Sequence, residues 1–232
     1  QGRHVAAFFD RYLRHTKGQW AGKPVTFEPW QDDTTDEVFR LDARGRRVYT
    51  DVTLGIPRKN SKSTLCAGYG LYLLGPDGEP GPEVYASAGS GDQANIVFGQ
   101  AKAFIDAVPE MRSWFRPMER TIRCDANGGF MRRLAADGKL NHGLNPHGSI
   151  IDELHAFTTP RQIDNYEALT TAGAARAQPL TIAISTAGDD PDSILGRIYS
   201  GMLESGSVER PGGKAREALK AGLTVFRDPD TG

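Results

Sequence analysis

Apolar residues recur with two different periods along the chain, and each period predicts a different kind of element. In the first 20 residues, Val5, Phe8, Phe9 and Leu13 recur at helical spacing, which predicts an amphipathic helix. An extended stretch over 25–31 precedes a second helical pattern over 33–41. The same period predicts further helices over 64–74, 93–108, 160–177, 194–203 and 215–221.

Short runs of β-branched and apolar residues predict the strands. They cover 47–54, 83–88, 149–152 and 180–185. Uninterrupted apolar runs of this length are typical of parallel strands that are covered on both faces. Because strands and helices alternate, the sequence predicts an α/β fold with a mostly parallel sheet flanked by helices. Residues 1–190 are expected to form the core, and the Gly-, Asp- and Ser-rich segment 191–232 a small lid or linker.

Composition excludes several classes of protein. The 232 residues carry a formal net charge of −1, which argues against a strongly basic, histone-like binder. A hydrophobic share of 38% is enough for a core and excludes wholesale disorder. The longest uncharged apolar stretch, 63–74, is about half of the ~20 residues that cross a bilayer, so we expect no membrane contact.

The start of the chain and its two cysteines indicate the cellular compartment that we expect for it. The chain begins at Gln1 without a signal-peptide pattern, so we expect a cytoplasmic piece of a longer protein. Cys66 and Cys124 lack the spacing of a metal site and are expected to be buried thiols in a reducing compartment.

A candidate phosphate loop lies between the predicted strand 47–54 and the helix 64–74. Gly55, Lys62 and Ser63 approximate the pattern G-x-x-x-x-G-K-[ST], with five residues instead of four between Gly55 and Ser61, which replaces the second glycine. Backbone N–H groups around residues 60–63 still suit phosphate oxygens, because the following helix presents its positive end there. Lys62 is expected to reach the β- and γ-phosphates, and the Ser63 hydroxyl to ligate Mg²⁺. The alternative is a basic loop that binds nothing.

Two later strands end in polar residues that suit the same chemistry. The apolar strand 149–152 ends in Asp152 and Glu153, one suited to holding Mg²⁺ and the other to polarising a water molecule. The strand 180–185 ends in Ser185 and Thr186, whose hydroxyls we expect near Glu153 or the γ-phosphate. Each ending is also compatible with an ordinary strand terminus.

Taken in order, these segments resemble the ATPase domain of the large terminases of tailed bacteriophages, a family of DNA-packaging motors. The family has an upstream aromatic-Gln motif, matched here by Pro29-Trp30-Gln31. It has a deviant phosphate loop, matched by residues 58–63, and a strand ending in DE, matched by residues 150–153. A coupling motif after the next strand is matched by residues 185–188. The resemblance implies a P-loop NTPase core of the ASCE or RecA-like type.

The resemblance also implies ATP and Mg²⁺ as cofactors and a role for each motif residue. Catalysis is expected from Glu153, Lys62 and, towards the γ-phosphate in cis, Arg58. Nucleotide binding is expected from Trp30, Gln31, Gly55, Arg58, Lys59, Asn60, Ser61, Lys62, Ser63 and Thr64. Ser63 and Asp152 would hold Mg²⁺, and Ser185 and Thr186 would couple hydrolysis to movement. Arg132 or Arg133 is the candidate for an arginine finger that acts on a neighbouring subunit, although both also fit an exposed strand.

The partners that the resemblance implies are double-stranded DNA, a portal protein, a small terminase subunit and further copies of the chain. The copies would form a ring, expected to be a pentamer on the portal, and the isolated domain would be a monomer in the host cytoplasm. A nuclease domain follows the ATPase in the family and is expected to be missing here. The acids Asp189, Asp190, Asp192, Asp228 and Asp230 are therefore interpreted as lid or linker surface.

Three alternatives remain at this point. A superfamily 2 helicase would share the DE-x-H run that ends at His155 and the Gln31 motif, but a second RecA-like half is lacking. A nucleotide-gated assembly module that does not hydrolyse would explain Ser61 but leaves Glu153 without a purpose. A zinc site at His142, His147 and His155 is disfavoured, because their spacing fits no common zinc pattern and no cysteine joins them.

Overall fold

The computed structural model describes residues 1–135, 143–186, 190, 192–205 and 224–227. Seven α-helices lie in this part of the chain: α1 (Gly2–Tyr12), α2 (Pro29–Val38), α3 (Lys62–Leu74), α4 (Gly91–Ala107), α5 (Pro109–Trp114), α6 (Pro160–Thr171) and α7 (Ile194–Ser205). The described strands are β1 (Asp51–Gly55), β2 (Glu83–Ala88), β3 (Phe115–Pro117), β4 (Thr121–Cys124), β5 (Gly129–Ala135), β6 (Pro146–Asp152), β7 (Leu180–Ser185) and β8 (Thr224–Arg227). Three short 3-10 helices join them: η1 (Gly18–Trp20), η2 (Leu154–Ala156) and η3 (Ala172–Ala175).

The described strands form one sheet in the order β3-β4-β5-β2-β6-β7-β1-β8. The five strands from β5 to β1 run parallel, whereas β3, β4 and β8 add antiparallel pairs at the two sides. β7 therefore lies between β1 and β6, and the carboxyl ends of these three strands share one edge of the sheet. This arrangement confirms the predicted α/β fold with a mostly parallel sheet.

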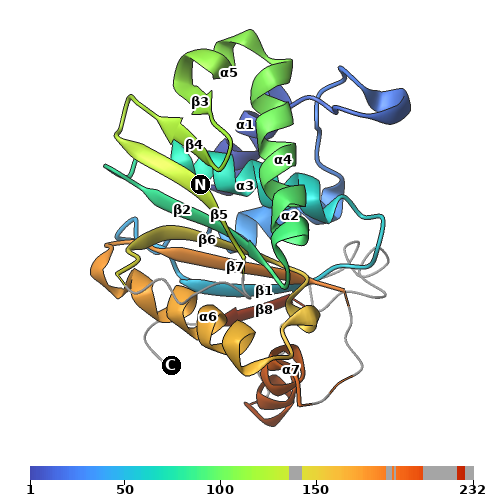
Figure 1. Cartoon of the computed structure of the whole chain (residues 1–232), viewed down its shortest axis with the longest axis vertical. Coiled ribbons are helices and arrows are strands. Elements are labelled where there is room, and N and C mark those ends of the chain that lie inside the picture. Colours follow the sequence, from blue (N-terminus) through green and yellow to red (C-terminus); the bar gives the residue numbers. More distant parts are fainter. Residues whose placement is uncertain (136–142, 187–189, 191, 206–223, 228–232) are drawn as a thin grey trace.

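Helices cover both faces of the sheet (Figure 1). α1 to α5 lie over one face and enclose the larger core, while α6 and α7 lie against the other face with η2. α3 is buried on nearly all sides, since 11 of its 13 residues are buried. A helix that is apolar all round belongs in the centre of a fold, and α3 is packed between the sheet and the other helices.

Two predicted strands, 83–88 and 180–185, are confirmed at the same residues. The strand predicted over 47–54 covers Asp51–Gly55 instead. Before it, Arg47 forms only an isolated antiparallel bridge with Leu41, and its backbone N–H donates to the Gln178 side chain. The strand predicted over 149–152 begins earlier, at Pro146, where it already pairs with Glu83 of β2. The extended stretch predicted over 25–31 is wrong at its end, because α2 begins at Pro29 and the Gln31 side chain caps it.

The antiparallel elements β3, β4 and β8 were not predicted. β3 and β4 have three and four residues, too few for a clear alternation. β8 lies within the segment predicted as a lid or linker and pairs with β1, and the division of the chain at residue 190 stays a prediction. The helix predicted over 215–221 lies outside the described residues.

A buried ion cluster fixes the opposite edge of the sheet, at the amino ends of its parallel strands. Asp77 Oδ2 lies 2.6 Å from Arg47 Nη2 and 2.6 Å from His147 Nε2. All three side chains are almost fully buried. The cluster ties the segment before β1, the loop after α3 and the start of β6 together, far from the strand ends that carry the predicted chemistry.

Candidate functional site

The predicted phosphate loop connects β1 to α3, and its backbone takes the shape that the missing glycine would have favoured. Ser61 lies in the left-handed region, with φ 58° and ψ 25°, and α3 begins at the next residue. Lys59 also has a positive φ, of 69°. Such angles are costly for residues other than glycine and persist where the surrounding structure imposes them. Ser61, which stands where the motif has glycine, therefore keeps the shape of the loop at a cost in backbone strain.

Lys62 is the first residue of α3 and lies buried at the carboxyl edge of the sheet. Its Nζ is 3.6 Å from Oε1 of Glu153, which follows β6. The first turn of a helix has N–H groups without intrahelical partners and carries partial positive charge. Lys62 and the start of α3 thus place positive charge beside the two acids that end β6.

Asp152 ends β6 and is 5% exposed. Its Oδ1 atom is buried and has no hydrogen-bond partner among the described residues. Burial, and then the charge of Glu153, raise the pKa of Asp152 to about 6, although Lys62 opposes them. A divalent cation next to this carboxylate would supply the missing counter-charge. Carboxylate and hydroxyl oxygens are ligands that Mg²⁺ accepts, so Asp152 and Ser63 fit the ion.

Glu153 also has left-handed backbone angles, with φ 54° and ψ 55°. Its Oε2 atom accepts from the Thr186 backbone N–H at 3.3 Å and from the Thr186 hydroxyl at 3.2 Å. The His155 Nδ1 atom lies 3.2 Å from the same oxygen. The carboxylate is therefore held from two sides, by Lys62 on Oε1 and by these groups on Oε2.

Ser185 and Thr186, the predicted coupling residues, lie against Glu153 in two different ways. Thr186 contacts the carboxylate directly. Ser185 is fully buried and reaches it through His155, because Ser185 Oγ lies 2.9 Å from His155 Nδ1 and accepts from the His155 backbone N–H at 3.1 Å. The structure thus brings the ends of β6 and β7 into one hydrogen-bonded group.

The remaining predicted nucleotide-binding residues lie around this group. Gly55 ends β1 and pairs with Ser185 of β7. Arg58, Lys59 and Asn60 are exposed in the loop, where the Asn60 amide donates to the carbonyl oxygens of residues 57 and 58 at 3.3 Å. Ser63 and Thr64 are partly buried in the first turn of α3.

The two residues of the aromatic-Gln motif lie on α2. Trp30 packs against the larger core. Gln31 is buried, and its Oε1 atom accepts from the Glu28 backbone N–H at 2.8 Å. The helix cap thus uses one acceptor site of the Gln31 amide and does not involve its NH₂ group.

The two arginines considered for action on a neighbour lie on β5, which β2 separates from β6. The Arg132 guanidinium lies 4.9 Å from the centre of the Phe130 ring. Arg133 lines a hollow of about 200 Å³ together with Arg120 and Gly91, at the start of α4. Among the described contacts, neither arginine touches Lys62 or Glu153.

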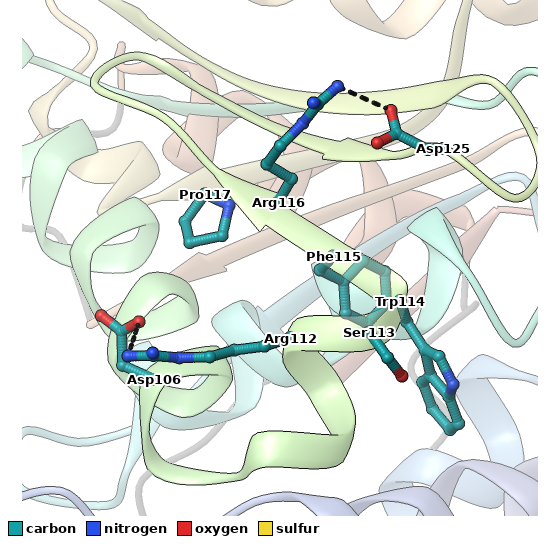
Figure 2. A pocket seen from close by; sticks show the side chains of 8 residues that line it. All are labelled: Asp106, Arg112, Ser113, Trp114, Phe115, Arg116, Pro117 and Asp125. Atoms are coloured by element: carbon teal, nitrogen blue, oxygen red, sulfur yellow. Dashed lines mark hydrogen bonds and ion pairs between the residues drawn. The ribbon is translucent and has the colours of Figure 1, made fainter.

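A larger hollow of about 410 Å³ lies at the far end of α4 and is bounded by α5 and β3 (Figure 2). Two ion pairs flank it, Arg112–Asp106 at 2.9 Å and Arg116–Asp125 at 3.0 Å. Both pairs are more than half exposed, so water screens them and they contribute little. We assign the candidate chemistry to the carboxyl edge of the sheet rather than to this hollow.

His155 is the site residue that sequence reasoning missed. It was weighed as a zinc ligand with His142 and His147, but His147 lies at the opposite edge of the sheet and His142 lies outside the described residues. The described residues hold no group of three His, Cys, Asp or Glu side chains suited to a metal. The DE-x-H run was the available signal, since it places His155 two residues beyond Glu153.

Comparison with known proteins places this geometry in a family. The model of the terminase large subunit ATPase domain matches residues 29–203. The large terminase subunit of Enterobacteria phage HK97 is 34% identical over 198 residues, which cover 83% of this chain and 38% of that protein. The chain thus spans less than half the length of this relative.

Solved structures agree with the sequence comparison. The crystal structure of the HK97 bacteriophage large terminase matches with a TM-score of 0.77 and 30% identity, over 89% of this chain and 42% of that chain. The large terminase of a thermophilic bacteriophage, solved in complex with ADP, shares the fold, with a TM-score of 0.55 and 11% identity over 83% of this chain and 47% of that one. The helices of the described residues include none that is long and apolar enough to cross a membrane. The family match and the HK97 relative show that the chain belongs to the ATPase domains of phage terminase large subunits.

Proposed function

We propose that this domain hydrolyses ATP and that hydrolysis drives double-stranded DNA into a procapsid. The observation that carries the proposal is the convergence of Lys62, Asp152, Glu153 and Thr186 at one edge of the sheet. A P-loop ATPase needs a cation for phosphate, a ligand for Mg²⁺ and a carboxylate for the attacking water. These side chains supply each of them. The terminase solved in complex with ADP supports a nucleotide as the ligand.

The position of each residue around the start of α3 and the end of β6 supports its proposed role. Lys62 and the N–H groups at the start of α3 bind the phosphates, and the exposed Arg58 reaches the γ-phosphate from the same loop. Ser63 and Asp152 hold Mg²⁺, which neutralises charge on the phosphate oxygens when bound. Glu153 orients a water molecule for in-line attack on the γ-phosphate.

Two further roles rest on the same proposal. Trp30 and Gln31 on α2 bind the adenine. Gln31 does so through the side-chain amide atoms that the helix cap does not use. Thr186 and Ser185 sense the state of Glu153, because their hydrogen bonds to it and to His155 change when the carboxylate moves. That change would couple hydrolysis to motion of the DNA-gripping part of the motor.

The arginine finger comes from a neighbouring copy in a ring, and Arg133 is the better placed of the two candidates. It lines a hollow with Arg120 at the start of α4, whereas Arg132 is stacked on Phe130. Such a finger is worth orders of magnitude in rate, so an isolated domain would turn over slowly. We propose that this ring, a pentamer, assembles on a portal protein in the host cytoplasm and works with a small terminase subunit.

Steady-state phosphate release, with and without DNA, tests the proposal on wild type and Glu153→Gln. We expect release from the wild type and a loss of about 10²–10⁴-fold in the variant, since a positioned base contributes that much. Equal, negligible release from both proteins at ring-forming concentrations would favour a nucleotide-gated assembly module instead. Release that a DNA single strand stimulates more than a duplex would favour a helicase-like translocase.

A further inference from the structure

We propose that His155 is a positioning residue, which fixes Glu153 and the loop after β7 as one unit through a proton on its Nδ1 atom. The inference rests on the proposed role of Glu153 in hydrolysis. It concerns the contacts that keep this carboxylate in place when Lys62 leaves it for a phosphate.

The position of the proton follows from counting donors. The Ser185 hydroxyl has one hydrogen, and it donates to the Thr186 carbonyl oxygen at 2.8 Å. Towards His155 Nδ1, 2.9 Å away, Ser185 Oγ must therefore accept. Oε2 of ionised Glu153, 3.2 Å from the same nitrogen, also accepts only. Both contacts require a hydrogen on Nδ1. The Thr186 hydroxyl oxygen, which donates its own hydrogen to Glu153 Oε2, lies 3.4 Å from the same nitrogen.

The local backbone explains why Glu153 needs such a support. Glu153 lies between β6 and the short helix η2, and its left-handed angles place it outside both elements. Its backbone direction is thus not set by a strand or helix ladder. Its side chain is 25% exposed and is held by the groups that face it: Lys62 Nζ on Oε1, and Thr186 and His155 on Oε2.

His155 links these groups to Ser185 twice. Its backbone N–H and its ring both bond to Ser185 Oγ, at 3.1 and 2.9 Å. A shift of the loop after β7 therefore moves the ring as well as the Thr186 donors. When a phosphate draws Lys62 away from Oε1, the donors on Oε2 keep the carboxylate aimed. Because misplacement by about 1 Å costs about 10²-fold in rate, this support bears on turnover rather than on ATP affinity.

Three variants separate this role from simple packing. The amide nitrogen of Asn occupies the place of Nδ1 in the same branch, so His155→Asn keeps the donor, whereas His155→Gln places its amide farther out and His155→Ala removes it. We expect His155→Ala and His155→Gln to lower kcat about 10- to 100-fold with little change in the Kd for ATP. His155→Asn should restore most of kcat. A Thr186→Val partner variant should show non-additive loss with His155→Ala, because both donors serve one oxygen.

The readouts are phosphate release, ATP calorimetry and thermal unfolding of the whole chain. Should His155→Ala fail to fold, the comparison of His155→Asn with His155→Gln still tests whether a donor at the place of Nδ1 is needed. Wild-type kcat in His155→Gln, or an Asn variant as slow as the Gln variant, would overturn the inference while the proposed function stands. Absence of release from the wild type would instead remove the proposed function, and the inference with it.

Discussion

Lys62 and Glu153 form an ion pair across the carboxyl edge of the sheet, with 3.6 Å between Nζ and Oε1. The pair joins the cation that we assign to the phosphates with the carboxylate that we assign to the attacking water. Under the proposed function, ATP replaces Glu153 as the partner of Lys62. ATP binding to Lys62 and the release of Glu153 from Lys62 are then one exchange of contacts.

Glu153→Gln should bind ATP more tightly than the wild type. Removing the carboxylate frees Lys62 from its ion pair, and a pair of this kind is worth up to about 1 kcal/mol, or about fivefold in affinity. Calorimetry with Mg²⁺ measures the effect. Glu37→Gln, which removes the ion pair between Glu37 on α2 and Arg40 just beyond the helix, is the control and should leave affinity unchanged. Weaker binding by Glu153→Gln would show that the carboxylate supports the nucleotide rather than competing with it.

Ser61→Gly should stabilise the fold and keep ATP binding. A glycine adopts the φ of 58° at this position at less cost, by about 1 kcal/mol. Urea unfolding measures the change. Ser90→Gly is a control of opposite sign, because Ser90 has a φ of −135° and its hydroxyl caps α4. A destabilised Ser61→Gly protein would mean that the serine hydroxyl, rather than the backbone, holds the loop.

Asp152→Asn should stabilise the metal-free protein in a pH-dependent manner. Burial and the charge of Glu153 raise the pKa of Asp152 to about 6 from 3.8, so the ionised form is disfavoured in the folded state. The penalty is absent below pH 3.8, grows between pH 3.8 and 6, and is complete above pH 6, where it amounts to about 3 kcal/mol. Urea unfolding in a chelator at pH 5 and 7.5 should show a larger gain at 7.5. A gain that shrinks as pH rises would contradict the account.

The buried cluster at the opposite edge should govern stability without affecting the nucleotide. Burial alone would raise the pKa of Asp77, but His147 and Arg47 outweigh it and lower the pKa below 3.8. Its contribution is therefore complete above pH 3.8 and is lost as the pH falls through the lowered value. Asp77→Asn should cost about 3–5 kcal/mol, because it leaves Arg47 buried without a counter-charge.

Asp106→Asn is the matched control for that prediction, since its ion pair with Arg112 is exposed and its loss should change little. Urea unfolding gives the free energies of both variants. An Asp77→Asn protein that still folds should keep the wild-type Kd for ATP. A large loss of ATP affinity in that folded protein would show that the two edges of the sheet are coupled.

Much of the fold could be predicted because its central strands are apolar and bounded by turn residues. The runs 83–88 and 180–185 were placed correctly for this reason. The antiparallel strands β3 and β4 were missed because they are short and carry exposed arginines, such as Arg116 and Arg123, rather than an apolar run. β8 pairs with β1 across about 170 residues of sequence, and no local pattern indicates such a partner.

The location of the site could be predicted from the ends of the strands, whereas the contacts between its side chains could not. Asp152, Glu153, Ser185 and Thr186 were expected to meet because parallel strands end at one edge of a sheet. The pairing of Lys62 with Glu153 depends on the left-handed backbone angles of Ser61 and Glu153. The residue types serine and glutamate do not predict such angles. His155 was considered as a metal ligand and as the end of the DE-x-H run, but its contact with Ser185 was not predicted, since the direction of its ring depends on the short helix after Glu153.

The central claim is that the loop between β1 and α3 binds ATP, with Lys62 as the phosphate cation. Calorimetry with ATP and Mg²⁺ on wild type, Lys62→Ala and, as a control, Lys102→Ala on α4 tests it most directly. The account predicts micromolar binding by the wild type and by Lys102→Ala, and loss of binding in Lys62→Ala. Equal binding by the wild type and a folded Lys62→Ala protein would contradict it.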